Sequence, residues 1–422
     1  MYYEVNGTMR NVPFSQGEYD ARLACAKRVM RENDLEVLFL TSPEALYYFS
    51  GYKLGWYRVN SKKQWNYYVP ASIAIHVDHE EFAFMDVAGE EEDVREDTVT
   101  KDIRIFTHAA RPTYGISGNA GTIPHGGTLM RAIAKNLKET GWLTSKVGIE
   151  SDKHGNHITK LVSNAFGEYG VKTTNASDLF DEIRKVKSKE ELDYIVRSAE
   201  IADVSMQAIK EYLKPGVTEN ELLGYATYKM ALAGGEPAGC SFIHGGQRVL
   251  RGHNYPSHEK LERGDVVVAD LFASHQRYSS DLSRVFTVGD VDYSRYSEEK
   301  SAFVKMAEKY HPIIREKVES ILKTNMLINE FTGQLKEFYQ ELGIWGQQFW
   351  LGGYDMGILW PGDCCGGSMV YDADMDKGDQ RFVPGTAVNF ETGFWVIDTL
   401  VFYEDRAIIA SKTPWDIVKC SH

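Results

Sequence analysis

Helical and extended hydrophobic patterns alternate along the first 150 residues. Apolar residues recur at helical spacing after Ser15, which is a favourable N-cap, so a helix is predicted over residues 15–31. Short apolar or alternating runs predict strands, and one further periodic segment predicts a helix. The predicted strands cover residues 35–40, 69–77, 82–87 and 146–151, and the second helix covers 124–140. This order predicts a small α/β domain.

Long helices and strand-like runs dominate the chain beyond residue 185. Ser188 and Glu191 have the spacing of a capping box, which predicts a helix that continues to about residue 213. Further helices are predicted at 294–322 and 326–342, and strands at 265–272, 283–288 and 386–402. The expected fold is therefore α+β. An N-terminal α/β domain (1–185) precedes a C-terminal domain of helices on a mostly antiparallel sheet (186–422).

The charge of the chain narrows the classes of partner. The 422 residues carry a formal net charge of −13, and the acidic residues are spread along the whole length. Nucleic acid and anionic membranes attract clustered Lys and Arg, so neither is an expected partner. No apolar run is long enough to span a membrane, no secretory signal is visible, and five scattered cysteines indicate no disulfide framework. A cytoplasmic location is expected.

Three polar patches lie on or beside predicted strands of the second half. They are centred on His253, on Asp270 with Asp281, and on Glu391. Asp270 ends the apolar run Val-Val-Val-Ala, and a carboxylate among apolar neighbours needs a partner or a raised pKa. Taken one at a time, these residues are typical of structural hydrogen-bonding positions. Their joint order and spacing are the basis for a resemblance to a known family.

That ordered set resembles the pita-bread hydrolases, the family of creatinase, prolidase and aminopeptidase P. In these enzymes a substrate-contacting His precedes a Gly-Asp turn, a strand carries the first metal-binding Asp, and a second Asp follows eleven residues later. The corresponding residues here are His253, the turn at 263–265, Asp270 and Asp281, the last within Ser-Asp-Leu-Ser-Arg (280–284). Residues 41–52 are also similar to the family, so the resemblance spans nearly the whole chain.

Two metal-ligand positions depart from the family's pattern. Tyr354 stands where the metal peptidases have a His, and Ile397 replaces the Glu that bridges two ions. Asp270, Asp281 and Glu391 remain, which are too few donors for a pair of ions but enough for one hard cation with waters. The favoured interpretation is a site with no cofactor, as in the metal-free relatives creatinase and ectoine hydrolase. A single divalent cation is the alternative.

The likeness to ectoine hydrolase is strongest around the lost ligands, in residues 353–357 and in Gly-Phe-Trp at 393–395. It implies a metal-independent hydrolase that cleaves an amidine, guanidine or amide C–N bond of a small zwitterion. His253 is then expected to transfer a proton, Asp270 to act as nucleophile or electrostatic anchor, and Glu391 to pair with a cationic nitrogen. Other residues are expected to bind substrate: Tyr354, Asp281, Asp355 and Trp395.

An aromatic and basic stretch at residues 55–68 is a second candidate for substrate binding. In creatinase-like dimers the matching region reaches the partner's active site, so the resemblance implies a homodimer. Arg58 is suited to bidentate binding of a substrate carboxylate, and Trp56 or Trp65 to stacking on a cationic nitrogen. The alternative is a surface loop with a few packed aromatic residues.

Three other functions compete with the metal-independent hydrolase. The first is a metal-dependent Xaa-Pro peptidase with a reduced metal site, which metal analysis would distinguish. The second is a lyase similar to the pita-bread dimethylsulfoniopropionate lyases, although these keep a full metal set. The third is a non-catalytic binding protein, which the presence of His253, Asp270 and Glu391 together disfavours.

Overall fold

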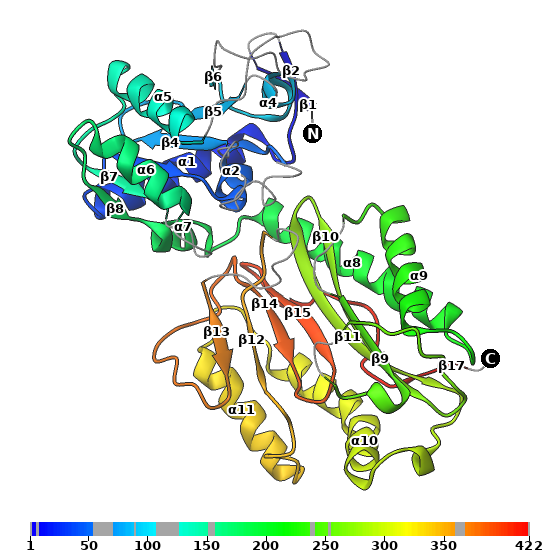
Figure 1. The fold of residues 1–422 in the computed structure, drawn as a ribbon. Helices are drawn as coiled ribbons and strands as arrows, with labels where there is room; N and C mark the ends of the chain where they lie inside the picture. The colour runs from blue at the N-terminus through cyan, green and yellow to red at the C-terminus, as the bar shows by residue number, and fades with distance from the viewer. Residues whose placement is uncertain are drawn as a thin grey trace. The chain divides into compact units, whose positions relative to one another are not determined.

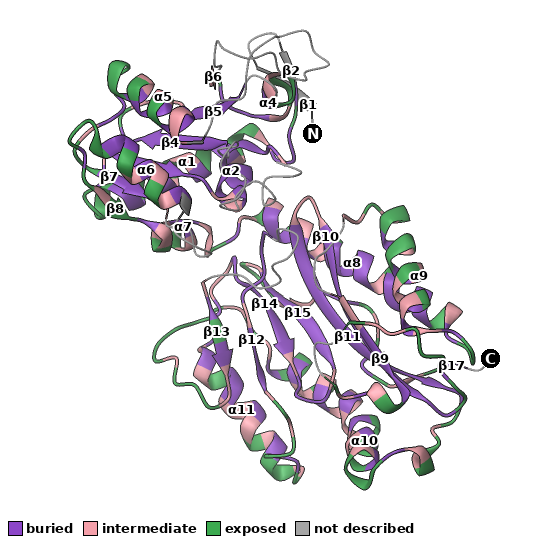
Figure 2. Cartoon of the chain, viewed as in Figure 1, coloured by how far each residue is buried: buried purple, intermediate pink, exposed green. Residues whose placement is uncertain are grey.

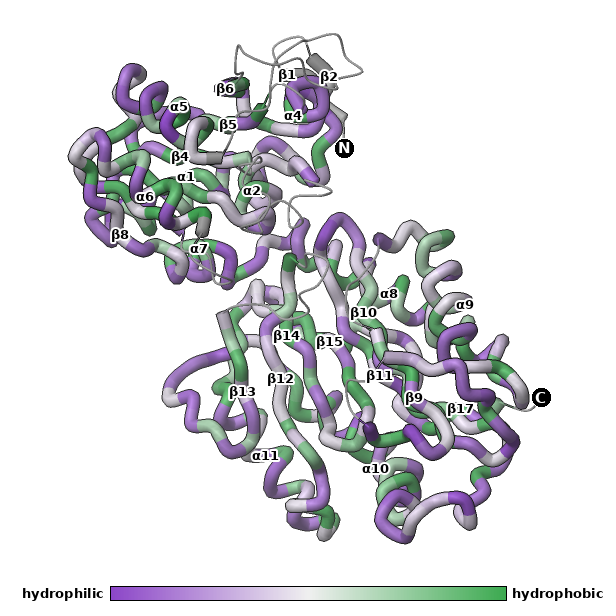
Figure 3. Tube along the Cα trace, viewed as in Figure 1, coloured by the Kyte–Doolittle hydropathy of each residue, from purple (hydrophilic) through white to green (hydrophobic). Residues whose placement is uncertain are grey.

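The protein is described from a computed structural model that covers residues 2–5, 8–53, 71–87, 90–106, 126–150, 157–236, 241–251, 255–358 and 368–420. The chain divides into two compact units, Met1–Arg184 and Lys185–His422 (Figure 1). Hydrophilic residues follow the connecting loops and the outer helix surfaces of each unit (Figure 3). In the described part of the chain no helix is both long and apolar enough to cross a membrane.

The N-terminal unit is built on a six-stranded sheet with the order β6-β5-β4-β3-β7-β8. Ser15 caps its first helix by accepting a hydrogen bond from the Glu18 amide, as the sequence predicts. The strands are β3 (Val37–Leu40), β4 (Ser72–His76), β5 (Ala83–Val87), β6 (Asp102–Phe106), β7 (Val147–Ile149) and β8 (Thr173–Asn175), and β1 (Tyr2–Val5) pairs with β2 (Thr8–Asn11). The helices are α1 (Gln16–Glu32), α2 (Pro43–Ser50), α4 (Glu91–Asp97), α5 (Gly126–Glu139), α6 (His157–Gly167) and α7 (Ser177–Arg184). The predicted α/β domain is confirmed.

The C-terminal unit contains a nine-stranded sheet, and Figure 2 shows its central strands largely buried. The strand order is β13-β12-β14-β15-β11-β10-β9, with β16 beside β15 and β17 beside β11. The strands are β9 (Ser241–Gly245), β10 (Val266–His275), β11 (Tyr278–Val288), β12 (Gly352–Tyr354), β13 (Val370–Asp372), β14 (Ala387–Glu391), β15 (Ile397–Phe402), β16 (Ala407–Ile409) and β17 (Val418–Cys420). Among the described strands of this sheet only the β11–β17 pairing is parallel, so the predicted mostly antiparallel sheet is confirmed.

Four long helices pack on this sheet: α8 (Lys189–Tyr212), α9 (Glu219–Leu232), α10 (Glu298–Ile321) and α11 (Ile328–Glu341). Helices α8 and α9 share a core with Leu271 of β10 and Leu282 of β11. Helices α10 and α11 share another with Phe390 of β14 and Leu400 of β15. Side chains alternate between the faces of a strand, so the neighbours of these apolar residues point to the other face. That other face carries the candidate site.

The capping box that the sequence predicts at the start of α8 is present. The Ser188 hydroxyl accepts a hydrogen bond from the Glu191 amide, and the Glu191 carboxylate accepts one from the Ser188 amide. We expect Ser188→Ala to lower the free energy of unfolding by about 1 kcal/mol, because one amide at the helix start loses its acceptor. Urea denaturation monitored by circular dichroism measures this loss. Ser188→Asp should restore most of it, and an equal loss in that variant would contradict the capping role.

Candidate active site

The register of β10 and β11 places Asp270 and Asp281 on one face of the sheet. Asp281 lies directly opposite Phe272, and Asp270 is two residues before Phe272 on the same strand. Paired residues of an antiparallel ladder point the same way, and so do residues two apart on one strand. The two carboxylates are therefore diagonal neighbours on one face.

The same reasoning extends across β15, β14 and β12. Ile397 of β15 lies opposite Ser283 of β11 and also opposite Glu391 of β14. Gly352 of β12 lies opposite Glu391, which puts Tyr354, two residues on, on the same face. Glu391, Ile397 and Tyr354 thus join Asp270 and Asp281. The pairing of these five strands brings together five side chains that are spread over more than 120 residues of sequence.

Hydrogen bonds connect three members of this group through Asn389. The Asn389 side-chain amide donates to Asp281 Oδ2 at 3.0 Å and to Glu391 Oε1 at 3.2 Å, and its Oδ1 accepts the Tyr354 backbone N–H at 2.6 Å. The Tyr354 hydroxyl also donates to Asp281 Oδ2, at 2.9 Å. Gly353 allows this close approach, because a Cβ there would collide with the Asn389 carbonyl oxygen.

Two buried carboxylate oxygens of the site accept no hydrogen bond from a described donor. Asp270 is 6% exposed and Asp281 is 1% exposed, yet no other described group donates a hydrogen bond to the Oδ1 atom of either. The two carboxyl groups lie close enough for one to hydrogen-bond the other when it is protonated. A buried polar atom normally has a partner, and one without it marks a functional position or a bound ion or water. These two oxygens therefore define the place where the site is chemically incomplete.

Burial raises the pKa of all three carboxyl groups. The pKa of Asp270 rises well above its ordinary value, first through burial and then through the negative charges of Asp281 and Glu391. Burial raises the pKa of Asp281 to about 6, although the hydrogen bonds from Tyr354 and Asn389 oppose the rise. Burial and the charge of Asp281 raise the pKa of Glu391 to about 8. Without a cation, the cluster retains protons at neutral pH.

This retention predicts how the stability of the cation-free protein depends on pH. The folded-state pKa values lie above the unfolded ones, so the folded state binds more protons and loses stability as pH rises. For Glu391 the loss falls between about pH 4.5 and 8, and we expect it to amount to about 3 kcal/mol. Chemical denaturation in EDTA across this range measures it. Glu391→Gln should flatten the slope, and an unchanged slope would contradict the assigned pKa.

Two other predicted substrate-binding residues lie at different positions. Asp355 forms a bridge with Val388, whose side chain faces away from the carboxylates, and its carboxylate accepts hydrogen bonds from Ser368 and Met369. The buried Lys187 ammonium lies 3.7 Å from Asp355 Oδ2. Asp355 is therefore held by Ser368 and Met369, directly before β13, and not by the carboxylate cluster.

Trp395 lies in the turn between β14 and β15 with a positive φ of 63°. Its carbonyl accepts the Ser283 hydroxyl at 3.0 Å, and its ring lies 5.3 Å from that of Phe349. Since Ser283 shares the face of Asp281, Trp395 borders the site through its backbone. Four further predicted residues fall outside the described residues: His253, Arg58, Trp56 and Trp65. Their roles stay predictions.

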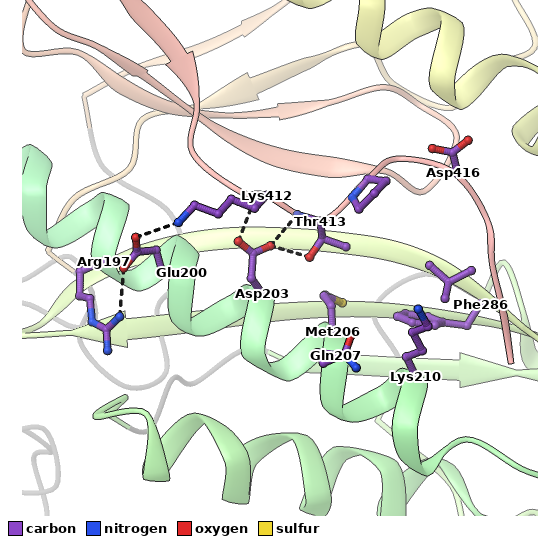
Figure 4. A pocket seen from close by; sticks show the side chains of 12 residues that line it. Arg197, Glu200, Asp203, Met206, Gln207, Lys210, Phe286, Lys412, Thr413 and Asp416 are labelled. Carbon is purple, nitrogen blue, oxygen red and sulfur yellow. Dashed lines mark hydrogen bonds and ion pairs between the residues drawn. The ribbon is translucent and has the colours of Figure 1, made fainter.

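The pocket shown in Figure 4 lies elsewhere in the C-terminal unit. It has a volume of about 750 Å³ and is bordered by α8, β11 and the segment before β17. Asp203 binds the backbone of Lys412 and Thr413, and Glu200 pairs with Arg197 and Lys412. Phe286, which lines it, packs in the core under α8 and faces away from the carboxylates. This pocket does not belong to the candidate site.

Asn389 is the residue of the site whose role the sequence does not reveal. It stands in the third polar patch, two positions before Glu391, and the spacing of two on a strand places both on one face. That spacing was the signal in the sequence that Asn389 belongs to the site. The bond to Tyr354 depends on the pairing of β12 with β14, which no local pattern specifies.

A small α/β unit followed by an antiparallel sheet that gathers carboxylates on one face defines a two-domain hydrolase of the creatinase and prolidase class. Residues 22–186 match the creatinase/prolidase N-terminal domain, and residues 193–411, more than half of the chain, match metallopeptidase family M24. The chain belongs to metallopeptidase family M24. The predicted family and the α+β fold are confirmed.

Individual relatives differ in how much of the chain they match. An Xaa-Pro dipeptidase from Pyrococcus furiosus is 27% identical over 407 residues, which is 94% of this chain and 99% of the relative. A creatinase from a Bacillus species is 25% identical over 235 residues, or 54% of each chain. The solved X-Pro aminopeptidase of Thermotoga maritima has a TM-score of 0.67 at 18% identity, covering 93% of this chain and 99% of that one, and supports the fold.

These findings correct two expectations from the sequence. The metal-independent hydrolase of a small creatine-like or ectoine-like compound is wrong, because the family is one of metallopeptidases and a relative that matches 94% of the chain is an Xaa-Pro dipeptidase. The absence of a cofactor is wrong for the same reason, since the family implies a divalent metal. The error arose because the loss of two metal ligands, at Tyr354 and Ile397, was taken to mean that no metal binds at all. Two ligand positions are altered, but the site's free carboxylate oxygens remain.

The residues present suit one hard cation. Among the described residues, no group of three or more His, Cys, Asp or Glu side chains is arranged so that it could hold a metal ion by itself. However, the unpartnered Oδ1 atoms of Asp270 and Asp281 are buried carboxylate oxygens, the donors that Mg²⁺ and Mn²⁺ prefer. A cation there would also offset the repulsion that raises the pKa of Asp270.

Proposed function

We propose that this protein is a divalent-cation-dependent peptidase that hydrolyses Xaa-Pro dipeptides. One observation carries the proposal: the two buried, unpartnered carboxylate oxygens of Asp270 and Asp281 lie in a chain that aligns along 94% of its length with an Xaa-Pro dipeptidase. Such a dipeptide is itself a small zwitterion, with an ammonium at one end and a carboxylate at the other.

Each side chain of the site has a distinct part in this reaction. Asp270 and Asp281 would hold a divalent cation, which would supply an activated water and polarise the scissile carbonyl. Glu391 lies on the same face as both aspartates and would accept the proton that the attacking water loses. Asn389 donates to Glu391 Oε1, so the accepted proton would reside on Oε2. From there Glu391 can protonate the departing proline nitrogen.

Turnover of matched dipeptides tests the proposal. The EDTA-treated protein, supplied in turn with Mn²⁺, Co²⁺, Zn²⁺ or Mg²⁺, is incubated with Ala-Pro, with Ala-Ala and with creatine. We expect cation-dependent release of proline, slower cleavage of Ala-Ala and no reaction of creatine. If none of the four cations supports proline release by the folded protein, or if EDTA leaves the rate unchanged, the proposal fails.

A homodimer remains a proposal as well. It follows from the resemblance to creatinase-like dimers and not from any contact in the described residues. Light scattering coupled to size-exclusion chromatography separates a dimer from the monomer of 47.8 kDa.

A further inference from the structure

We propose that the site holds one divalent cation and not two, because the Asn389 amide and the Tyr354 hydroxyl take the second position between the carboxylates. The cation binds between the Oδ1 atoms of Asp270 and Asp281. This inference deepens the proposed function, on which it rests only in requiring that the site binds a cation.

The two oxygens of Asp281 are used for different purposes. Its Oδ2 accepts two hydrogen bonds, from the Tyr354 hydroxyl at 2.9 Å and the Asn389 amide at 3.0 Å, whereas its Oδ1 has no partner among the described residues. An ionised carboxylate oxygen has about two acceptor sites, so Oδ2 is already satisfied by the protein. Only Oδ1 is left for a cation. The Oδ1 of the diagonal neighbour Asp270 is likewise unpartnered.

The Asn389 amide bridges Asp281 and Glu391 as a second cation would. Its Nδ2 lies 3.0 Å from Asp281 Oδ2 and 3.2 Å from Glu391 Oε1. Its orientation is fixed, because Oδ1 accepts the Tyr354 backbone N–H at 2.6 Å, and only the NH₂ end can then face the carboxylates. Asn389 is fully buried, so this amide cannot turn aside for an ion without losing that bond.

Ile397 removes the remaining donor. It lies on the face of the carboxylates, opposite both Glu391 and Ser283, and is 5% exposed. Two ions about 3.5–4 Å apart need a negatively charged group between them to offset their repulsion. A buried alkyl group at this position supplies no such charge. The second position therefore lacks a ligand as well as being occupied by a hydrogen-bond donor.

Counting bound Mn²⁺ tests this inference without reference to turnover. Isothermal titration calorimetry and elemental analysis of the desalted protein give the stoichiometry, and electron paramagnetic resonance reports coupling between neighbouring ions. We expect one equivalent in the wild type with the spectrum of an isolated Mn²⁺, and at least 100-fold weaker binding in Asp270→Asn. The triple variant Asn389→Ala, Tyr354→His, Ile397→Glu should bind two equivalents with a coupled spectrum, whereas Ile397→Leu should bind one.

Two tight equivalents or none in the wild type would overturn the inference, and so would a folded triple variant that still binds only one. The wild-type stoichiometry decides the matter if the triple variant does not fold. Failure of the proposed function is distinguishable: one bound Mn²⁺ without proline release removes the peptidase and leaves the single-cation site. Proline release by a protein that binds two ions would support the peptidase activity and overturn the single-cation site.

Discussion

Asp281→Asn is expected to reduce cation-dependent hydrolysis on the order of 10³-fold, because a cation contributes several kcal/mol of charge stabilisation to such a reaction. Asparagine has nearly the same shape as aspartate, but it presents a neutral amide where Asp281 Oδ1 is free. If its amide nitrogen turns instead toward Tyr354 and Asn389, two donors face a third donor. The measurements are the rate of proline release and the affinity for Mn²⁺.

Asp265→Asn provides the matched control. Asp265 is also a buried aspartate at the start of β10, but it accepts the Glu262 amide and pairs with Arg295 at 3.2 Å. We expect this variant to keep Mn²⁺ affinity within a few-fold of wild type. Equal losses in Asp265→Asn and Asp281→Asn would show that the effect comes from folding, and a fully active Asp281→Asn would exclude this carboxylate from the site.

The sequence predicted the frame of the site because its signals are local. The capping box at Ser188 and the apolar strand before Asp270 each lie within a few neighbouring residues. The spacing of eleven between Asp270 and Asp281 spans the tight β10–β11 hairpin, but it was recognised through the family resemblance, because the second predicted strand began only at residue 283. Hydrophobic periodicity and helix-capping chemistry were sufficient to predict individual helices and strands.

The remaining features of the site depend on strand pairing between distant segments, which the sequence pattern did not predict. Residues 386–402 were predicted as one strand-like run, but β14 and β15 are separated by a turn in which Trp395 has a positive φ, uncommon for a bulky residue. The turn places Ile397 opposite Glu391 and, through β11, beside Asp281. Which donors satisfy which carboxylate oxygen follows only from that register. A count of retained ligands therefore gave the wrong cofactor.

The second large effect concerns the opposite face of the same strands, where Arg284→Ala is expected to lower the free energy of unfolding by about 4 kcal/mol. Arg284 and Asp398 are both 0% exposed and their ion pair measures 2.6 Å. The guanidinium also donates to the carbonyls of Ile397, Thr413 and Pro414. Its removal leaves a buried carboxylate without its cation and takes one donor from each of these carbonyls, of which that of Thr413 keeps the hydrogen bond from Arg315.

Thermal and urea unfolding measure the loss, with Arg406→Ala as the control. Arg406 pairs with Asp405 at 3.1 Å, but both side chains are more than 60% exposed, so the expected change is below about 1 kcal/mol. Arg284→Ala should also weaken Mn²⁺ binding, because Arg284 joins β11 to β15 directly behind Ser283 and Ile397, which fix the spacing of Asp281 and Glu391. A stable Arg284→Ala variant with unchanged Mn²⁺ affinity would mean that strand pairing alone holds the carboxylates in place.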